Sequence, residues 1–173
     1  MKVVYGEDVE SYYAEVFDKK TGEFLTRYGV YKEAEVATRS GYTYRTVYED
    51  VDYGAGMIDG RLSTRLIISG SGSFAQIEGI SSTWWSERGA GVGELINDNC
   101  DSMSSTGSFP TLKIETDGSA VCKVAVDVST STTFDGSVTI KMLVDFGFSQ
   151  SYSAGGTIYF TKSRDCNYTY RLY

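Results

Sequence analysis

Alternation of apolar and polar residues, repeated along much of the chain, is the feature that most constrains how this sequence can fold. A period of two residues is typical of β-strands with one buried face, whereas an amphipathic helix has a period of 3.6. Long stretches with helical periodicity are missing. Two segments show the pattern most clearly: 42–51, with Tyr42, Tyr44, Thr46 and Tyr48 on one face, and 61–69, with Leu62, Thr64, Leu66 and Ile68 on one face.

Turn signals separate the alternating runs. Gly22 lies between the runs 12–17 and 23–28, which predicts a β-hairpin at the N-terminus. The dipeptides Asp117-Gly118 and Asp135-Gly136 predict two further hairpins, because both central residues of a type I′ turn need positive φ. We read the Gly-, Asn-, Asp- and Ser-rich segment 89–109 as mostly loop, although 92–96 could form a brief strand. The remaining strands are expected at 74–80, 82–86, 112–116, 120–129, 137–148, 157–162 and 167–172.

These strands predict an all-β fold, with about ten strands at roughly 8–12-residue spacing, as in antiparallel β-sandwiches or partly closed barrels. In segment 137–148 the apolar set Val138, Ile140, Met142, Val144, Phe146 and Phe148 predicts one buried sheet face. Nine of the 14 tyrosines lie in the first 60 residues. We therefore divide the 173 residues into an N-terminal hairpin and linker segment, 1–40, and a β-sandwich domain, 41–173.

Composition excludes several function classes. The chain has no histidine, which removes Ser/His/Asp and Cys/His nucleophilic sites and the common zinc sites. Its net charge of −7 and lack of a basic run argue against a nucleic-acid partner, because that affinity depends on Lys and Arg. No run is long enough for a transmembrane span. The first eight residues turn acidic before an apolar run forms, so we expect no signal peptide in this chain.

The run from Ser73 to Trp84, followed by a Gly/Val segment, a cysteine and then Cys122 within a strand, resembles small secreted β-proteins of Gram-positive bacteria. The resemblance covers residues 40–173 and carries no diagnostic motif. It implies export, with the signal peptide missing from this chain, and supplies no catalytic residue. Some proteins of this general kind are described as bacteriocin-like.

The three cysteines allow one disulfide with one thiol left over. We favour Cys100 with Cys122, which would join the long loop to a central strand and stabilise the fold. Cys100 with Cys166 is the next choice, and three reduced thiols are the alternative. No histidine is present to activate a thiol, so we expect no cysteine nucleophile.

Acidic residues suggest two kinds of site. Segment 97–102 contains Asp98 and Asp101 among asparagines, and such oxygen ligands suit calcium, although the EF-hand pattern is absent. The alternative is a loop whose Asx side chains bond their own backbone. A pair of carboxylates could also serve a glycoside hydrolase, but nothing selects two among 23 acidic residues. Beyond possible calcium, we expect no cofactor and no enzymatic activity.

Aromatic residues give the most suggestive candidate site. Tyr42, Tyr44 and Tyr48 form a stripe, and the adjacent Trp84 and Trp85 must face opposite sides of a strand. Exposed aromatic rings suit sugar rings or a protein partner, although aromatic residues also favour strands for packing reasons alone.

We therefore predict a secreted, non-enzymatic binding or structural module with a glycan or protein partner. An unpaired strand edge could also lead to oligomers. The alternative is a secreted antimicrobial or membrane-acting toxin, since the hydroxyl-rich segments flanking 137–148 are typical of β-barrel pore formers.

Overall fold

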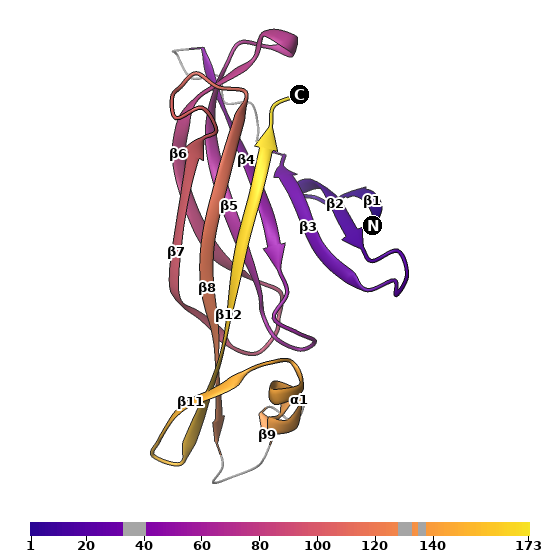
Figure 1. Ribbon diagram of the computed structural model, residues 1–173, viewed down its shortest axis with the longest axis vertical. Helices are drawn as coiled ribbons and strands as arrows, with labels where there is room; N and C mark the ends of the chain where they lie inside the picture. The colour runs from indigo at the N-terminus through magenta and orange to yellow at the C-terminus, as the bar shows by residue number, and fades with distance from the viewer. Residues whose placement is uncertain (33–40, 128–132, 135–137) are drawn as a thin grey trace.

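Nearly all regular structure is β, arranged in two main antiparallel sheets that face each other without closing into a barrel (Figure 1). This computed structural model describes residues 1–32, 41–127, 133–134 and 138–173. It confirms the predicted antiparallel β-sandwich. No helix among the described residues is long and apolar enough to span a membrane.

The first sheet has six strands that follow one another in sequence order, each antiparallel to the next. The strands are β1 (Lys2–Glu7), β2 (Ser11–Phe17), β3 (Phe24–Tyr31), β4 (Tyr42–Val51), β5 (Asp59–Ser69) and β6 (Gln76–Arg88). β4 has the predicted bounds, and β5 begins two residues earlier than predicted. The predicted face of β5 is buried, since Leu62, Thr64 and Leu66 are fully buried. The face of β4 that turns to the core carries Val47 and Val51, so the predicted stripe of Tyr42, Tyr44 and Tyr48 lies on its other face.

The second sheet has the order β11-β12-β8-β7. Its strands are β7 (Glu94–Ser104), β8 (Lys113–Asp127), β11 (Ser149–Ala154) and β12 (Thr157–Arg171). Three short elements complete the described structure: a 3₁₀ turn at Gly72–Phe74, the pair β9 (Thr133–Phe134) and β10 (Val138–Thr139), and the helix α1 (Ile140–Asp145).

Strands β7, β8 and β12 lie across from β4, β5 and β6. Apolar side chains fill the space between them, and at one end of the sandwich a second apolar cluster forms around Leu143 of α1. The buried members of the main cluster are Val47, Leu62, Leu66, Ile68, Ile77, Trp85, Ile114, Ala120, Cys166 and Tyr168. Burial of this apolar area is the main stabilising term of the fold.

A chain of hydroxyl groups crosses the middle of this core. Thr64 Oγ1 lies 3.0 Å from Thr116 Oγ1 and 2.9 Å from Ser102 Oγ, and Tyr168 OH donates to Thr64 Oγ1 at 2.8 Å. Thr64 and Thr116 are buried, so each hydroxyl requires such a partner. The network joins β5 to β7, β8 and β12, and it fixes how the two sheets align.

The predicted hairpin at Asp117-Gly118 is wrong, because both residues lie inside β8 and pair with strands on both sides. Gly118 serves close packing instead of a turn. A Cβ at this position would lie 2.8 Å from the Asn99 carbonyl oxygen and 3.0 Å from Trp85 Nε1, so only glycine fits. The second dipeptide, Asp135-Gly136, lies outside the described residues.

The predicted strand 137–148 is also wrong, because α1 occupies its centre. Thr139 caps the helix by accepting a hydrogen bond from the Met142 amide, at 3.2 Å. At the other end, Gly147 has a φ of 82°, and the amides of Gly147 and Phe148 donate to the carbonyls of Val144 and Leu143. This is a Schellman motif, and it ends the helix. Local capping therefore overrides the alternation of Val138 to Phe148.

Several strands are longer than the sequence predicted. β7 runs through the segment expected to be a loop, because its inward-facing residues include the small or polar Cys100, Ser102 and Ser104, which give no apolar alternation. Its ladder is interrupted by a bulge at Asn97, whose φ is 50°. β6, β8 and β12 are each continuous where the pattern suggested two strands.

The N-terminal hairpin is present, with Gly22 at φ 74°, and it extends the first sheet. β3 pairs with β4 from Arg27–Asp50 to Val30–Val47, so β1–β3 continue the sheet beyond the part that β7, β8 and β12 cover. We call β1–β3 the wing (Figure 1). Residues 33–40 lie outside the described residues, and the domain boundary at residue 40 stays a prediction.

Gly29 in β3 is required where the wing joins the sandwich, and its substitution tests this. A Cβ at residue 29 would overlap the ring of Tyr48, which is fully buried. We expect Gly29→Ala to destabilise the protein by about 1–3 kcal/mol, the usual cost of overpacking, measured by urea unfolding. Gly79→Ala is the control, because its nearest neighbour is Ile67 Cδ1 at 3.8 Å. Equal midpoints for both variants would contradict this account.

Candidate functional site

The inner face of the wing carries two rows of aromatic and aliphatic side chains. One row runs from Tyr5 through Ala14 to Tyr28, and the other joins Tyr12 to Val30. Because Val30 pairs with Val47 of the core, both rows lie on the face that β4 turns toward the second sheet. Among the described elements, no strand of the second sheet packs extensively against them. The wing therefore presents an uncovered aromatic face.

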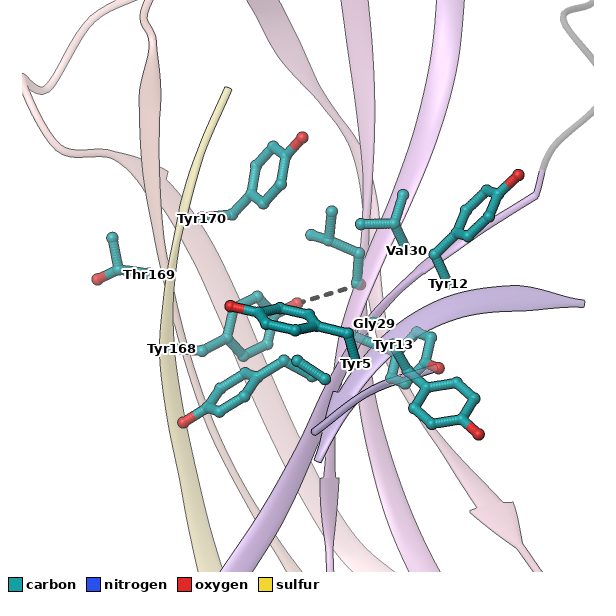
Figure 2. A pocket seen from close by; sticks show the side chains of 12 residues that line it. Tyr5, Tyr12, Tyr13, Gly29, Val30, Tyr168, Thr169 and Tyr170 are labelled. Atoms are coloured by element: carbon teal, nitrogen blue, oxygen red, sulfur yellow. Dashed lines mark hydrogen bonds between the residues drawn. The ribbon is translucent and has the colours of Figure 1, made fainter. Parts of the chain in front are cut away.

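A groove runs between this face and the upper part of β12 (Figure 2). Its volume is about 340 Å³. Figure 2 shows Tyr5 pointing from β1 across the groove toward β12. The lining contains seven of the 14 tyrosines in the chain. We call this the tyrosine groove, lined by Tyr5, Tyr12, Tyr13, Ala14, Tyr28, Gly29, Val30, Val47, Tyr48, Tyr168, Thr169 and Tyr170.

The two walls of the groove differ in exposure. On the wing, Tyr5 is 82%, Tyr12 58% and Tyr28 40% exposed. On the β12 side, the Tyr168 hydroxyl is held in the core, and Tyr170 OH accepts a hydrogen bond from Arg45 Nη1 at 2.9 Å. The side chains of the β12 wall are thus held in place by hydrogen bonds, whereas the rings of the wing wall remain exposed to solvent.

Tyr48 holds the wing against the sandwich from the opposite face of the sheet. Its hydroxyl lies 2.8 Å from Ser11 Oγ of β2, and its ring packs over Gly29 of β3. The Arg61 guanidinium lies 3.5 Å from the centroid of that ring and makes two hydrogen bonds to Asp50, of 2.5 and 2.8 Å. A cation over an aromatic face adds to the stability of the packed ring. This cluster joins β2 and β3 to β4 and β5.

A buried carboxylate, Glu49, lies beside the groove. Burial raises its pKa, and hydrogen bonds from Thr26 Oγ1 at 3.0 Å and from Cys166 Sγ at 3.4 Å act in the opposite direction. Burial, with the Glu49 charge nearby, raises the pKa of Tyr28 to about 12. The same causes raise the pKa of the Cys166 thiol. Tyr28 and Cys166 therefore stay protonated at neutral pH and act as hydrogen-bond donors.

The aromatic residues predicted from the sequence do not form one site. Trp85 is in the core, where its Nε1 donates to the Asn99 carbonyl at 3.0 Å, and Tyr48 is buried as described above. Tyr42, Tyr44 and Trp84 lie on the outer face of β4 and β6, with Arg65 over the ring of Tyr44 at 4.5 Å. The sequence analysis did not identify most of the residues that line the groove. The concentration of tyrosines in the first 60 residues was the signal that could have indicated them.

The two predicted calcium ligands lie in different parts of β7. Asp98 is in the bulge of β7, whereas Asp101 pairs with Asp117 of β8. Among the described ranges of the chain, no group of three or more acidic or cysteine side chains is placed to hold a metal ion. Calcium binding at Asp98 and Asp101 therefore stays a prediction without geometric support.

The predicted Cys100–Cys122 disulfide is absent, and all three cysteines are free thiols. Cys100 pairs with Gly118 of β8, so it lies four residues, or about 13 Å, from Cys122 along that strand. A disulfide requires Cα atoms within about 7 Å. Cys166 pairs with the same Gly118 from the other side, which puts it about 10 Å from Cys100. The Trp85 indole fills the space over Gly118 between them.

A polar pocket of about 220 Å³ lies on the other side of the sheet. It brings three aspartates together with Arg27, Arg61 and Arg88. Asp50 is engaged by Arg61. Burial, with the charges of Asp52 and Asp50, raises the pKa of Asp59 to about 6. Asp59 therefore carries a destabilising charge at neutral pH.

Replacing Asp59 tests this electrostatic environment. Its folded-state pKa is higher than its unfolded value, so its ionisation lowers stability progressively between about pH 3.8 and 6, and the penalty persists above that. We expect Asp59→Asn to raise the melting temperature by a few degrees at pH 7.5 and to lose this advantage near pH 4. Asp98→Asn, at an exposed position, is the control for the charge change. A melting temperature lowered at pH 7.5 would contradict the assignment.

Comparisons with known proteins give no family for this chain. No family model matches it, and neither curated proteins nor solved structures yielded a match. Its relation to secreted proteins of Gram-positive bacteria therefore stays a prediction from the sequence. The function must be argued from the geometry of the tyrosine groove.

Proposed function

We propose that this protein is a non-enzymatic binding module that holds its ligand in the tyrosine groove. The observation that carries the proposal is the concentration of seven tyrosines around one groove, three of them with large exposed surfaces on the wing. Tyrosine contributes a large rigid contact area and a hydroxyl at low entropic cost, which is why it is frequent in binding sites. Contiguous exposed apolar patches on a protein of this kind mark interaction sites.

The fixed walls of the groove favour binding. Tyr168 and Tyr170 are held by hydrogen bonds to Thr64 and Arg45, and the wing is held by Tyr48 and Arg61. Lys32 Nζ, 4.6 Å from the centroid of Tyr12, restricts that ring as well. A site whose walls are ordered before binding loses less conformational entropy when the ligand arrives.

The lining of the groove supports a binding role over catalysis. Its residues carry hydroxyl, apolar and backbone groups, and none of the lining side chains is a carboxylate, thiol or amine. General acid and base catalysis requires a group that titrates near the working pH. The tyrosine hydroxyls instead provide hydrogen bonds that orient a ligand.

Export of the protein remains a prediction from composition and resemblance. The disulfide that would have supported an oxidising compartment is absent. The binding proposal does not depend on the compartment, because the groove is built from packing and hydrogen bonds.

Ligand screens that compare the native protein with a variant carrying two groove substitutions test the proposal. A glycan array and a displayed library of random peptides are each probed with the native protein and with the Tyr12→Ala/Tyr28→Ala variant. We expect ligands selected by the native protein to bind the variant at least about 30-fold more weakly, because truncation of a central aromatic contact costs about 2 kcal/mol.

The control is the Tyr42→Ala/Tyr44→Ala variant, which changes the outer face of β4 and leaves the groove intact. Circular dichroism and thermal melting confirm that both variants are folded. Ligands that bind the groove variant normally and lose affinity for the outer-face variant would assign binding to the stripe predicted from the sequence, and would refute the groove.

A further inference from the structure

Two thirds of β12 has an edge that no described strand pairs with. β8 pairs with β12 along its whole length, whereas β11 covers only residues 157–161 at one end of the molecule (Figure 1). Residues 162–171 therefore have a ladder partner on one side only among the described strands. A long free edge of this kind is a template for pairing with another chain.

The direction of the free hydrogen-bonding groups follows from the ladder. In antiparallel pairs, successive residues alternate between bonding the partner and pointing away from it. The Leu172 amide donates to the Leu112 carbonyl, so even-numbered residues of β12 bond toward β8. The amide and carbonyl groups of the odd-numbered residues point to the free side. These residues are Ser163, Asp165, Asn167, Thr169 and Arg171.

This edge opens into the tyrosine groove. Thr169, one of the odd-numbered residues, lines the groove between Tyr168 and Tyr170. Across from it lie the rows led by Tyr5 and Tyr12 on the wing. A strand placed beside β12 would turn every second side chain toward these rows, because strand side chains alternate between faces.

One end of the groove is acidic. A neighbouring pocket of about 350 Å³ continues between β3 and β12, and it is lined by Glu23, Glu49, Asp50, Asp52 and Asp165 against the single cation Arg164. Asp50 already pairs with Arg61, and Glu49 is held by Thr26 and Cys166. Glu23 and Asp165 are exposed. The excess of carboxylates favours a ligand that is positively charged where it meets this pocket.

Building on the proposed binding function, we propose that the ligand is an extended polypeptide segment of another protein, which adds as a strand to residues 162–171 of β12. Its alternate apolar side chains pack on Tyr5, Tyr12 and Tyr28, and a Lys or Arg side chain at one end enters the acidic pocket. Main-chain hydrogen bonds give such strand addition its affinity, and the pockets for alternate side chains give its specificity.

The test measures binding of a synthetic peptide, acetyl-Lys-Val-Thr-Val-Thr-Tyr-Thr-amide, to the full chain by isothermal titration calorimetry. Two altered peptides accompany it: one with Glu in place of Lys, and one N-methylated at alternate residues. N-methylation removes the edge donors and keeps every side chain. We expect each change to weaken binding at least about tenfold.

Protein variants provide the matched measurement. Thr169→Pro removes one outward amide from β12 without removing a bond to β8, and proline is tolerated at such edge positions. Thr169→Ala keeps the amide and removes only the side chain. We expect Thr169→Pro to weaken binding of the unmodified peptide and Thr169→Ala to preserve it. If Thr169→Pro lowers the melting temperature strongly, the N-methylated peptide decides the question.

The outcomes separate this inference from the proposed function. If ligands need Tyr12 and Tyr28 but bind equally well after N-methylation, or if only glycans bind, strand addition is refuted and the binding groove stands. If substitution of Tyr12 and Tyr28 changes nothing, the groove itself is refuted. If sedimentation shows a dimer that Thr169→Pro dissociates, a second copy of the chain occupies the groove. That result would overturn the assignment of the ligand to another protein.

Discussion

Packing of the Tyr48 ring over Gly29 is the contact on which the shape of this molecule depends. It joins β2 and β3 of the wing to the central strands, with Ser11 on the hydroxyl and Arg61 over the ring. A side chain larger than hydrogen at residue 29 would displace the ring and, with it, the angle at which the wing leaves the sandwich. The inner face of the wing is therefore directed across from β12, and the tyrosine groove exists because that angle is fixed.

The groove also follows from a mismatch between the two sheets. The first sheet has six strands, and among the described elements β7, β8 and β12 pack closely against β4–β6. Its uncovered part would normally be polar, because exposed sheet faces usually are. Here it carries tyrosines that remain exposed. Within the described part of the chain, exposed hydrophobic area and a strand edge without a ladder thus occur at the same place, and one extended segment would satisfy both.

The sequence predicted elements whose signals are local. β5 was found because its inward residues are largely apolar, β4 because tyrosines alternate along its outer face, and the first hairpin because Gly22 supplies a turn. β7 was missed because its inward residues are small and polar, and Gly118 was misread because packing against Trp85 also requires glycine. The groove could not be predicted, since Tyr5 and Tyr168 meet only through strand pairings and a sheet angle that no local pattern encodes.

Residue-resolved amide hydrogen exchange of the ligand-free chain tests the central claim, the free edge of β12, most directly. Amides bonded within a ladder exchange far more slowly than amides that face solvent. The account predicts alternation along the strand, with fast exchange at Ser163, Asp165, Asn167 and Thr169 and strong protection at Arg164, Cys166 and Tyr168. Uniform protection of residues 163–170 would show that this edge is already paired, and it would contradict the account.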